Sequence, residues 1–364
     1  MSPTHLRSSF QTTFFAIATP NLKLRATGYI IQTRLQSTTS NTDLSSAPAS
    51  SQALLSSFLV TPTALSNALR KNVYTKLSTS PRVIPLCAAW FMPNDPKSRT
   101  GHAAYLAGHV PRARFFDLDA VSDKNSPYPH MLPSPEVFAQ ALGKLGIRRD
   151  DSVVVYDSAE LGIFSAPRVA WTLRVFGHPE IHILNNFKTW VDQGLPVEKG
   201  EPEEKVSEES YPVPTIDSSM VESFDELKQR LSEQEGKKEG AEAFTVIDAR
   251  SPGRFDGSDA EPRPGISSGH MPSAINIPFT DVLSARTKAF LSPEELRVYF
   301  ECKNVDPKKP IVSSCGTGVT ACVIDAALTE AGYPQEGRKV YDGSWTEWAM
   351  REEEVKDLIV KGDK

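Results

Sequence analysis

The sequence of 364 residues is poor in cysteine and contains no long hydrophobic run. Its four cysteines form neither a CxxC pair nor a paired cysteine–histidine spacing, so we expect no disulfide framework, no metal site and a reducing compartment. The longest apolar runs fall far short of a transmembrane span, and we therefore expect no membrane as a partner. The formal net charge of -5 at pH 7 lacks the positive excess of nucleic-acid-binding proteins, so we expect no nucleic acid as a partner either.

Acidic residues are absent from residues 1–42, whereas arginine, lysine, serine and threonine are present there. The apolar residues are interspersed with the basic ones, which is typical of a mitochondrial transit peptide and not of a secretory signal with a continuous apolar core. We predict a transit peptide and a flexible, serine-rich spacer over residues 1–57. The alternative is a disordered tail without a targeting role. The expected location is the mitochondrial matrix, and the sequence leaves a coexisting cytoplasmic form open.

Two short motifs recur in the chain at nearly the same distance. A Gly-His-x-Pro-x-Ala element at residues 108–113 returns 161 residues later at 269–274. Asp157 follows an apolar run in the first half, and Cys315 follows a similar run 158 residues further on. A near-constant offset between separate landmarks predicts a tandem duplication.

Each half alternates short apolar runs with helical stretches. This alternation predicts an α/β fold of two similar domains, each a parallel sheet with helices on both faces. We place the first domain at residues 58–197 and the second at 213–364, with a charged linker at 198–212. In the second domain the expected strands are Phe244–Asp248, Pro310–Ser314 and Lys339–Tyr341, and the expected helices are Pro293–Cys302 and Val319–Ala331.

Cys315 ends an apolar run, and two glycines follow it within three residues before a helical pattern begins. The order predicts a strand, a tight loop and a helix, with the thiol at the carboxyl end of the strand. Backbone N–H groups of such a loop converge with the positive end of the helix, and both favour the thiolate that a nucleophile needs. The alternative is a buried structural cysteine. Because the matching residue of the first half is Asp157, we expect one catalytic half and a ligand site between the halves.

The loop from Cys315 to Thr320 contains no cation, which limits the chemistry that it can perform. Cysteine phosphatases clamp the phosphoryl group with an arginine about six residues after the thiolate, and Ala321 stands there. A cysteine protease needs a histidine base. His270 and His130 are available, but His270 recurs as His109 in the half without a nucleophile, which favours an architectural role. Attack on sulfur needs only an activated thiolate, a site for an anionic donor and a loop that stabilises a persulfide, and no cofactor.

The paired halves, the Gly-His-x-Pro-x-Ala element and the Cys-x-x-Gly-x-Thr loop resemble those of two-domain rhodaneses over roughly residues 58–355. The resemblance implies a sulfurtransferase with tandem rhodanese-like domains. Thiosulfate-preferring members typically have basic residues at the second and third loop positions, whereas mercaptopyruvate sulfurtransferases have Gly-Ser. Gly316-Thr317 is similar to the second kind, with threonine in place of serine. The implied donor is 3-mercaptopyruvate; the alternatives are a thiosulfate sulfurtransferase and a persulfide carrier that docks another protein of a thiolation pathway.

The same resemblance implies a set of site residues. The implied nucleophile is Cys315, which forms the persulfide, and the loop amides that stabilise it are those of Gly316, Thr317, Gly318, Val319 and Thr320. The implied acceptor of the sulfur is thioredoxin, another small thiol or cyanide. The segment Tyr341–Trp345 is expected to wall the pocket.

Two arginines nine residues apart in the family match Arg254 and Arg263, which would clamp the donor's carboxylate. Either one alone could equally form a surface ion pair. A family proton relay matches Asp119, His130 and Thr317. Pro129 stands where related enzymes often have aspartate, and His130 could also be an ordinary histidine of a buried turn.

Overall fold

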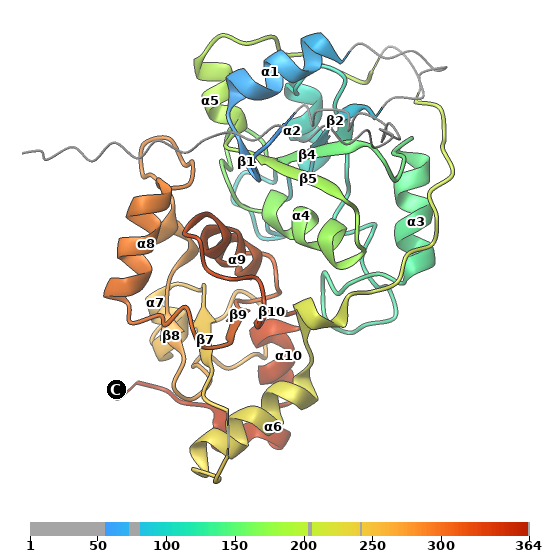
Figure 1. The fold of residues 1–364 in the computed structure, drawn as a ribbon. Helices are drawn as coiled ribbons and strands as arrows, with labels where there is room; N and C mark the ends of the chain where they lie inside the picture. Colours follow the sequence, from blue (N-terminus) through green and yellow to red (C-terminus); the bar gives the residue numbers. More distant parts are fainter. Residues whose placement is uncertain (1–54, 73–80, 203–205, 241, 363–364) are drawn as a thin grey trace, which may run out of the picture. The chain divides into compact units, whose positions relative to one another are not determined.

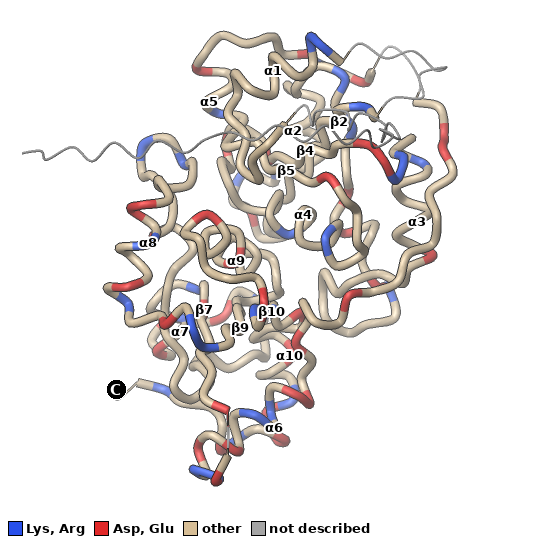
Figure 2. The backbone as a smooth tube through the Cα atoms, in the orientation of Figure 1, with Lys and Arg blue, Asp and Glu red and all other residues tan. Residues whose placement is uncertain are grey.

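The computed structural model describes residues 55–72, 81–202, 206–240 and 242–362, and Figure 1 shows its course. Residues 1–54 of the predicted transit peptide and spacer lie outside the described residues. Within the described ranges no helix combines the length and the apolar character that crossing a membrane requires. Basic and acidic residues are interspersed along both halves (Figure 2).

The first half is built on a five-stranded sheet whose strands all run parallel in the order β1-β5-β4-β2-β3. Its strands are β1 (Leu59–Val60), β2 (Val83–Cys87), β3 (Arg114–Phe115), β4 (Ser152–Tyr156) and β5 (Glu180–Leu184). Its helices are α1 (Pro62–Lys71), α2 (Gly101–Ala107), α3 (Pro135–Lys144), α4 (Ala166–Val175) and α5 (Phe187–Asp192).

The second half repeats this arrangement in a parallel sheet of order β6-β10-β9-β7-β8. Its strands are β6 (Val221–Glu222), β7 (Thr245–Asp248), β8 (Ile275–Asn276), β9 (Ile311–Ser314) and β10 (Arg338–Tyr341). Its helices are α6 (Phe224–Glu235), α7 (Pro252–Asp256), α8 (Pro293–Cys302), α9 (Ala321–Glu330), α10 (Ser344–Met350) and α11 (Glu352–Val355). Each strand thus has its counterpart at the same place in the first sheet, and the predicted fold class is confirmed.

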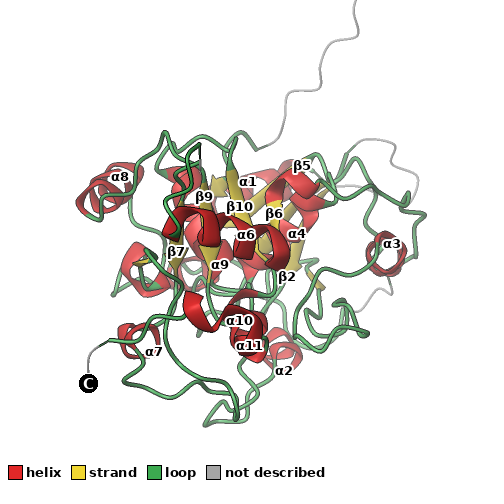
Figure 3. Cartoon of the chain, turned by 90° about the horizontal axis from the view of Figure 1, so that it is seen from below, coloured by secondary structure: helices red, strands yellow, loops and turns green. Residues whose placement is uncertain are grey.

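Helices cover both faces of each sheet (Figure 3) because successive residues of a strand point to opposite sides. In β4, Val153 and Val155 face the core under α3 and α4, whereas Val154 and Tyr156 face the core under α1, α2 and α5. The second sheet divides in the same way between α8 and α9 on one face and α6 and α10 on the other. The strands are buried on both faces, which explains their uninterrupted apolar runs.

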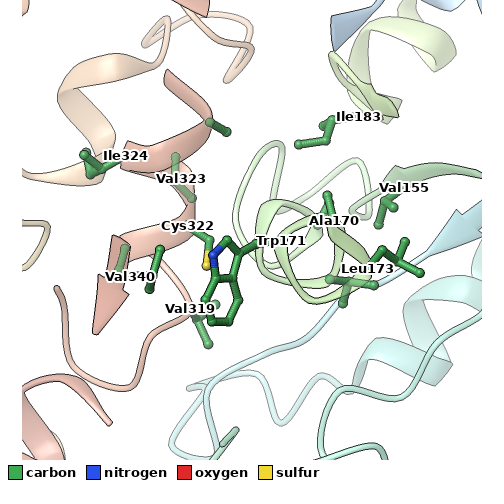
Figure 4. Close-up of a cluster of buried hydrophobic side chains, with 14 of the residues drawn as sticks. Val155, Ala170, Trp171, Leu173, Ile183, Val319, Cys322, Val323, Ile324 and Val340 are labelled. Carbon is green, nitrogen blue, oxygen red and sulfur yellow. The ribbon is translucent and has the colours of Figure 1, made fainter. Parts of the chain in front are cut away.

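The two halves share one hydrophobic core along α4 and α9. Figure 4 shows Trp171 of α4 next to Cys322 of α9 and to Val319, which lies just before α9. Helices α4 and α9 follow the equivalent strands β4 and β9, so matching elements of the duplication face each other. The loop between β9 and α9, which carries Cys315, therefore lies next to the contact between the halves.

The residues expected to form a charged linker pack against the first half. Glu198 exchanges two backbone hydrogen bonds with His109, at 2.9 and 3.0 Å. Tyr211 is buried against Phe138, and its hydroxyl lies 2.9 Å from Nδ1 of His178. This segment is therefore part of the folded surface of the first half where the structure describes it.

Candidate active site

The thiol of Cys315 lies at the carboxyl end of β9, and the residue is 2% exposed. The loop after it runs to Thr320, and α9 begins at Ala321, two residues later than the sequence pattern indicates, because Val319 and Thr320 belong to the turn that enters the helix. Val319 points into the shared core, so only its backbone is available to a ligand in the loop.

Gly318 has a structural reason to be glycine. Its φ of +74° lies in the left-handed region, and a Cβ there would come within 2.6 Å of the carbonyl oxygen of Asp342. Gly316 differs, because a Cβ at that position would meet only the Nη2 atom of Arg254, at 2.9 Å. The loop therefore needs glycine at one position for its backbone and at the other for room beside an arginine.

The backbone of the loop is held by the turn between β10 and α10. The N–H of Cys315 donates to Oγ of Ser344 at 3.2 Å, and the carbonyl of Cys315 accepts from the N–H of Trp345 at 2.9 Å. The carbonyl of Gly316 accepts from the N–H of Thr346 at 3.0 Å. The turn before α10 thus fixes the main chain of Cys315, whereas the cavity between the halves is lined by Thr346 and Met350 and by no residue of the segment Tyr341–Trp345 that was expected to wall it.

A chain of polar side chains joins the loop to the first half. Nδ1 of His130 lies 3.1 Å from Oγ1 of Thr317, and Nε2 of His130 lies 3.2 Å from Oδ1 of Asp119. Asp119 also accepts from Nε1 of Trp90 at 2.8 Å, and the Trp90 ring meets the His130 ring edge-on. The carboxylate requires a proton on Nε2, which leaves Nδ1 as the acceptor of the Thr317 hydroxyl.

The electrostatics of this chain keep His130 neutral and Asp119 ionised. Burial lowers the pKa of His130 below its usual value, against the opposing hydrogen bond and charge of Asp119. The hydrogen bond from His130 lowers the pKa of Asp119, and the one from Trp90 acts in the same direction. Although Pro129 provides no carboxylate, the imidazole still has an acidic partner in Asp119. The arrangement can exchange a proton with a molecule bound beside the loop.

Arg254 is already part of an ion-pair network. Its guanidinium lies 2.6 Å from Glu261, which also pairs with Arg250 at 2.7 Å. Arg250 is held in turn by Asp248 at 2.6 Å and lies over the ring of Trp345. Glu261 thus fixes Arg254 beside Gly316 and offsets much of its charge.

Arg263 has no such partner: among the described residues no hydrogen bond or ion pair holds its guanidinium. Burial lowers its pKa, as does the charge of Arg254, whereas Glu261, Cys315 and Asp119 act in the opposite direction. A partly buried cation with unused donors is suited to hold a small anion such as a carboxylate.

A cavity of about 420 Å³ lies at the mouth of the site, between the two halves. Its walls come from the first half (Asp119, Lys124, Tyr128, His130) and from the second (Arg263, Thr346, Met350), among others. Its volume is within the range of small-molecule sites. A cavity thus lies between the halves, where a ligand site is expected, and its wall includes Asp119, His130 and Arg263.

Known proteins share this architecture. The profile of the rhodanese-like domain matches residues 223–351. Human 3-mercaptopyruvate sulfurtransferase is 39% identical over 283 residues, which are 76% of this chain and 88% of that protein. Bovine thiosulfate sulfurtransferase is 41% identical over 273 residues, 73% of this chain and 84% of that protein. A yeast mitochondrial complex I sub-stoichiometric sulfur transferase subunit superposes with a TM-score of 0.71 and 38% identity, covering 84% of this chain and all of that one.

The chain belongs to the rhodanese family. The resemblance predicted from the sequence is thereby confirmed, and with it the class of activity, sulfur transfer.

In the first rhodanese-like half, the position of the nucleophile is filled by a carboxylate. Asp157 is completely buried and accepts hydrogen bonds from the N–H groups of Phe164, Ser165 and Ala166, at 2.8, 3.2 and 2.9 Å. Burial raises its pKa to about 6, against those hydrogen bonds. In a catalytic half the N–H groups of this loop would bind an anion, whereas here they bind the side chain of Asp157. The first half therefore contributes to the site without a cysteine at this position.

The repeated histidines of the two rhodanese-like halves have architectural positions. His109 places its ring nitrogens 3.0 Å from the carbonyl of Val110 and 3.2 Å from that of Gly200. His270 lies 2.8 Å from the carbonyl of Phe255 and stacks on that ring.

Sequence reasoning missed three residues that organise the rhodanese site: Trp90, Ser344 and Arg168. No sequence pattern pointed to Trp90, and Ser344 was included only as part of the segment Tyr341–Trp345, without a role of its own. Arg168 did leave a signal, because it stands among apolar residues in the pattern of α4 and its side chain is buried. A charged residue in a buried helix needs partners, and two of the three acceptors that Arg168 contacts lie in the other half.

Proposed function

We propose that this chain is a 3-mercaptopyruvate sulfurtransferase in which Cys315 carries the transferred sulfur as a persulfide. The observation that supports this donor is the hydrogen-bonded chain Asp119–His130–Thr317, which reaches the loop beside the thiol. The carbon fragment left by 3-mercaptopyruvate needs a proton, whereas the sulfite left by thiosulfate leaves without one. A proton relay in the loop is therefore useful for the first donor and superfluous for the second.

In the proposed reaction the Cys315 thiolate attacks the sulfur of 3-mercaptopyruvate. A sulfur–sulfur bond forms, the carbon–sulfur bond breaks, and its electron pair passes to carbon as the enolate of pyruvate. The Thr317 hydroxyl delivers a proton to the enolate, and its oxygen regains one from the thiol of the donor by way of Nδ1 of His130, which is free to accept it; Asp119 orients the imidazole through Nε2. The loop amides between Gly316 and Thr320 stabilise the charge on sulfur.

The donor's carboxylate is assigned to Arg263, assisted by Arg254. Arg263 lines the cavity and has unused donors, whereas Arg254 is held by Glu261 at the edge of the loop. Arg263 then supplies most of the charge that binds the carboxylate, and Arg254 fixes the orientation of the donor next to Gly316.

A second substrate must remove the outer sulfur. An acceptor thiolate attacks it, takes it as a new persulfide and releases the Cys315 thiolate, which makes a two-step cycle without a metal or an organic cofactor. Thioredoxin, another small thiol or cyanide has the required nucleophilicity. The family's alternatives are thiosulfate as the main donor, which a cationic loop would favour, and delivery of the sulfur to a docked protein of a thiolation pathway.

We also propose that residues 1–57 direct the protein to the mitochondrial matrix. The support is their composition, basic and hydroxyl-rich without an acid before Asp43, together with the mitochondrial source named for a structurally similar yeast subunit. A fluorescent protein fused behind residues 1–57 should accumulate in mitochondria. Uniform cytoplasmic fluorescence would contradict the proposal.

A single-turnover experiment tests the proposed chemistry. Without an acceptor, one equivalent of 3-mercaptopyruvate should give one equivalent of pyruvate and add one sulfur atom to Cys315, as seen by mass spectrometry. Cys315→Ser should release no pyruvate, whereas Cys302→Ser, which removes an exposed cysteine elsewhere, should behave as the wild type. Equal pyruvate release by Cys315→Ser would reject the persulfide mechanism.

A further inference from the structure

Arg168 connects the catalytic loop to the proton relay from a buried position. It belongs to α4 of the first half, and its side chain is 1% exposed. Its guanidinium contacts three acceptors: Nη1 donates to the carbonyl of Gly318 at 3.3 Å, and Nη2 donates to the carbonyl of His130 at 2.5 Å and lies 2.5 Å from Oδ1 of Asp342. Two of these acceptors belong to the second half, and the third is the main chain of the relay histidine.

On the loop side, the contact is close enough to require glycine. A Cβ at Gly318 would lie 2.7 Å from Nη1 of Arg168. The left-handed backbone of Gly318 thus leaves the space that the guanidinium fills. A change in the position of Arg168 would release the carbonyl that fixes the middle of the loop, one residue from Thr317.

On the relay side, the contact holds an unusual backbone. His130 has a φ of +66°, a left-handed conformation that residues other than glycine rarely adopt. Arg168 holds its carbonyl, and Oδ2 of Asp342 accepts from the N–H of Leu132 at 2.8 Å. The ion pair of Arg168 and Asp342 therefore secures the main chain directly after His130, from its carbonyl to the N–H of Leu132.

The charge of this group is permanent. Burial opposes ionisation, but the charge of Asp342 and its hydrogen bond with the guanidinium outweigh this effect, so the pKa of Arg168 is raised. A lysine would present one compact charge, whereas the planar guanidinium can reach acceptors on both halves at once.

We infer that Arg168 is a positioning residue, which sets the distance between Thr317 and His130 by holding the loop and the His130 turn from one guanidinium. The half without a nucleophile thus contributes both the relay imidazole and the group that aligns it with the loop. This inference rests on the proposed function, since the relay matters only for a donor whose leaving fragment needs a proton.

The test is a set of conservative variants with a matched control. Arg168→Lys retains a positive charge but loses the planar guanidinium that reaches several acceptors. It should lower kcat for 3-mercaptopyruvate by about 10- to 100-fold, because a displacement of about 1 Å at a reacting group has effects of this size. KM should change by less than about threefold, by the same principle. Arg338→Lys is the control, since Arg338 is equally buried, donates to the carbonyl of Asp325 at 2.8 Å and lies at the amino end of β10, away from the loop. Its kcat should stay near that of the wild type.

A double variant separates positioning from general stability. If Arg168 acts through the relay, Arg168→Lys should add less than about threefold to the loss of kcat already caused by Thr317→Val, because residues of one coupled unit are not additive. Arg338→Lys combined with Thr317→Val should show only the loss of Thr317→Val. Asp342→Asn, which weakens the hold on Arg168 without altering it, provides a second route if Arg168→Lys does not fold.

The outcomes distinguish this inference from the proposed function. The positioning role would be overturned if Arg168→Lys and Asp342→Asn both kept a kcat within threefold of the wild type. It would also be overturned if their losses of kcat simply multiplied with that of Thr317→Val. In either case the turnover of mercaptopyruvate by the wild type would still support the proposed function. If the wild type releases no pyruvate at all, the proposed function itself fails, and the inference fails with it.

Discussion

Replacement of Thr317 by valine removes one hydroxyl from the site and retains a side chain of similar shape. In the structure that hydroxyl is 3.1 Å from Nδ1 of His130. The change therefore removes the last member of the proton relay and leaves a buried imidazole nitrogen without its partner.

Two effects of different size follow. An unpartnered buried polar atom costs about 1–3 kcal/mol of unfolding free energy, so the protein should remain folded but become measurably less stable. Loss of a positioned proton donor should lower kcat for 3-mercaptopyruvate by about 10²- to 10⁴-fold. The sulfite released from thiosulfate needs no proton, so the turnover of thiosulfate should change by less than about threefold.

The assay is steady-state turnover of both donors by the wild type, Thr317→Val and Thr317→Ser, with urea unfolding of each. Thr317→Ser retains the hydroxyl and is the matched control, which should preserve most of the mercaptopyruvate activity. Equal losses for both donors in Thr317→Val would refute the reasoning, because the hydroxyl would then support the loop and not the protonation of the enolate.

Two further predictions concern the charge on the relay and the glycines of the loop. Asp119→Asn removes the carboxylate that opposes the effect of burial, so the pKa of His130 should fall further and the acid limb of the kcat/KM profile should move to lower pH; a shift to higher pH would contradict the assignment. Gly318→Ala should cost about 1–3 kcal/mol in chemical denaturation, because of its positive φ and the nearby carbonyl of Asp342. Gly316 has no positive φ, and a Cβ there would meet only the partly exposed guanidinium of Arg254, so Gly316→Ala should destabilise the protein less than Gly318→Ala; equal destabilisation by both changes would show that the backbone at Gly318 is less constrained than its geometry implies.

The fold could be predicted because its signals are local and occur twice. Uninterrupted apolar strands, the repeated Gly-His-x-Pro-x-Ala element and the common offset of Asp157 and Cys315 indicate two parallel sheets, and the structure has them in the same strand order. The helix after the loop was predicted with its start two residues too early, at Val319, because the hydrophobic pattern does not distinguish a core-facing turn residue from the first turn of a helix.

The relay and its support depend on contacts between residues far apart in the sequence. His130 and Thr317 are 187 residues apart, and only the family resemblance suggested that they meet. Arg168 and Gly318 are 150 residues apart, and no local pattern shows which acceptors a buried arginine will find. Contacts of this kind arise from the packing of α4 on α9, which the sequence does not specify residue by residue.

The residues around Cys315 are proposed to select 3-mercaptopyruvate as the sulfur donor. The most direct test is the ratio of kcat/KM for 3-mercaptopyruvate to kcat/KM for thiosulfate, measured for the wild type, Arg254→Ala and Arg263→Ala. Arg286→Ala is the control, since Arg286 is exposed and lies outside the cavity wall. We expect the wild type to favour 3-mercaptopyruvate by orders of magnitude. Arg263→Ala should raise the KM for this donor by about 10- to 100-fold through loss of a charged hydrogen bond, and Arg286→Ala should leave both donors unaffected. A wild-type preference for thiosulfate would contradict the proposed donor.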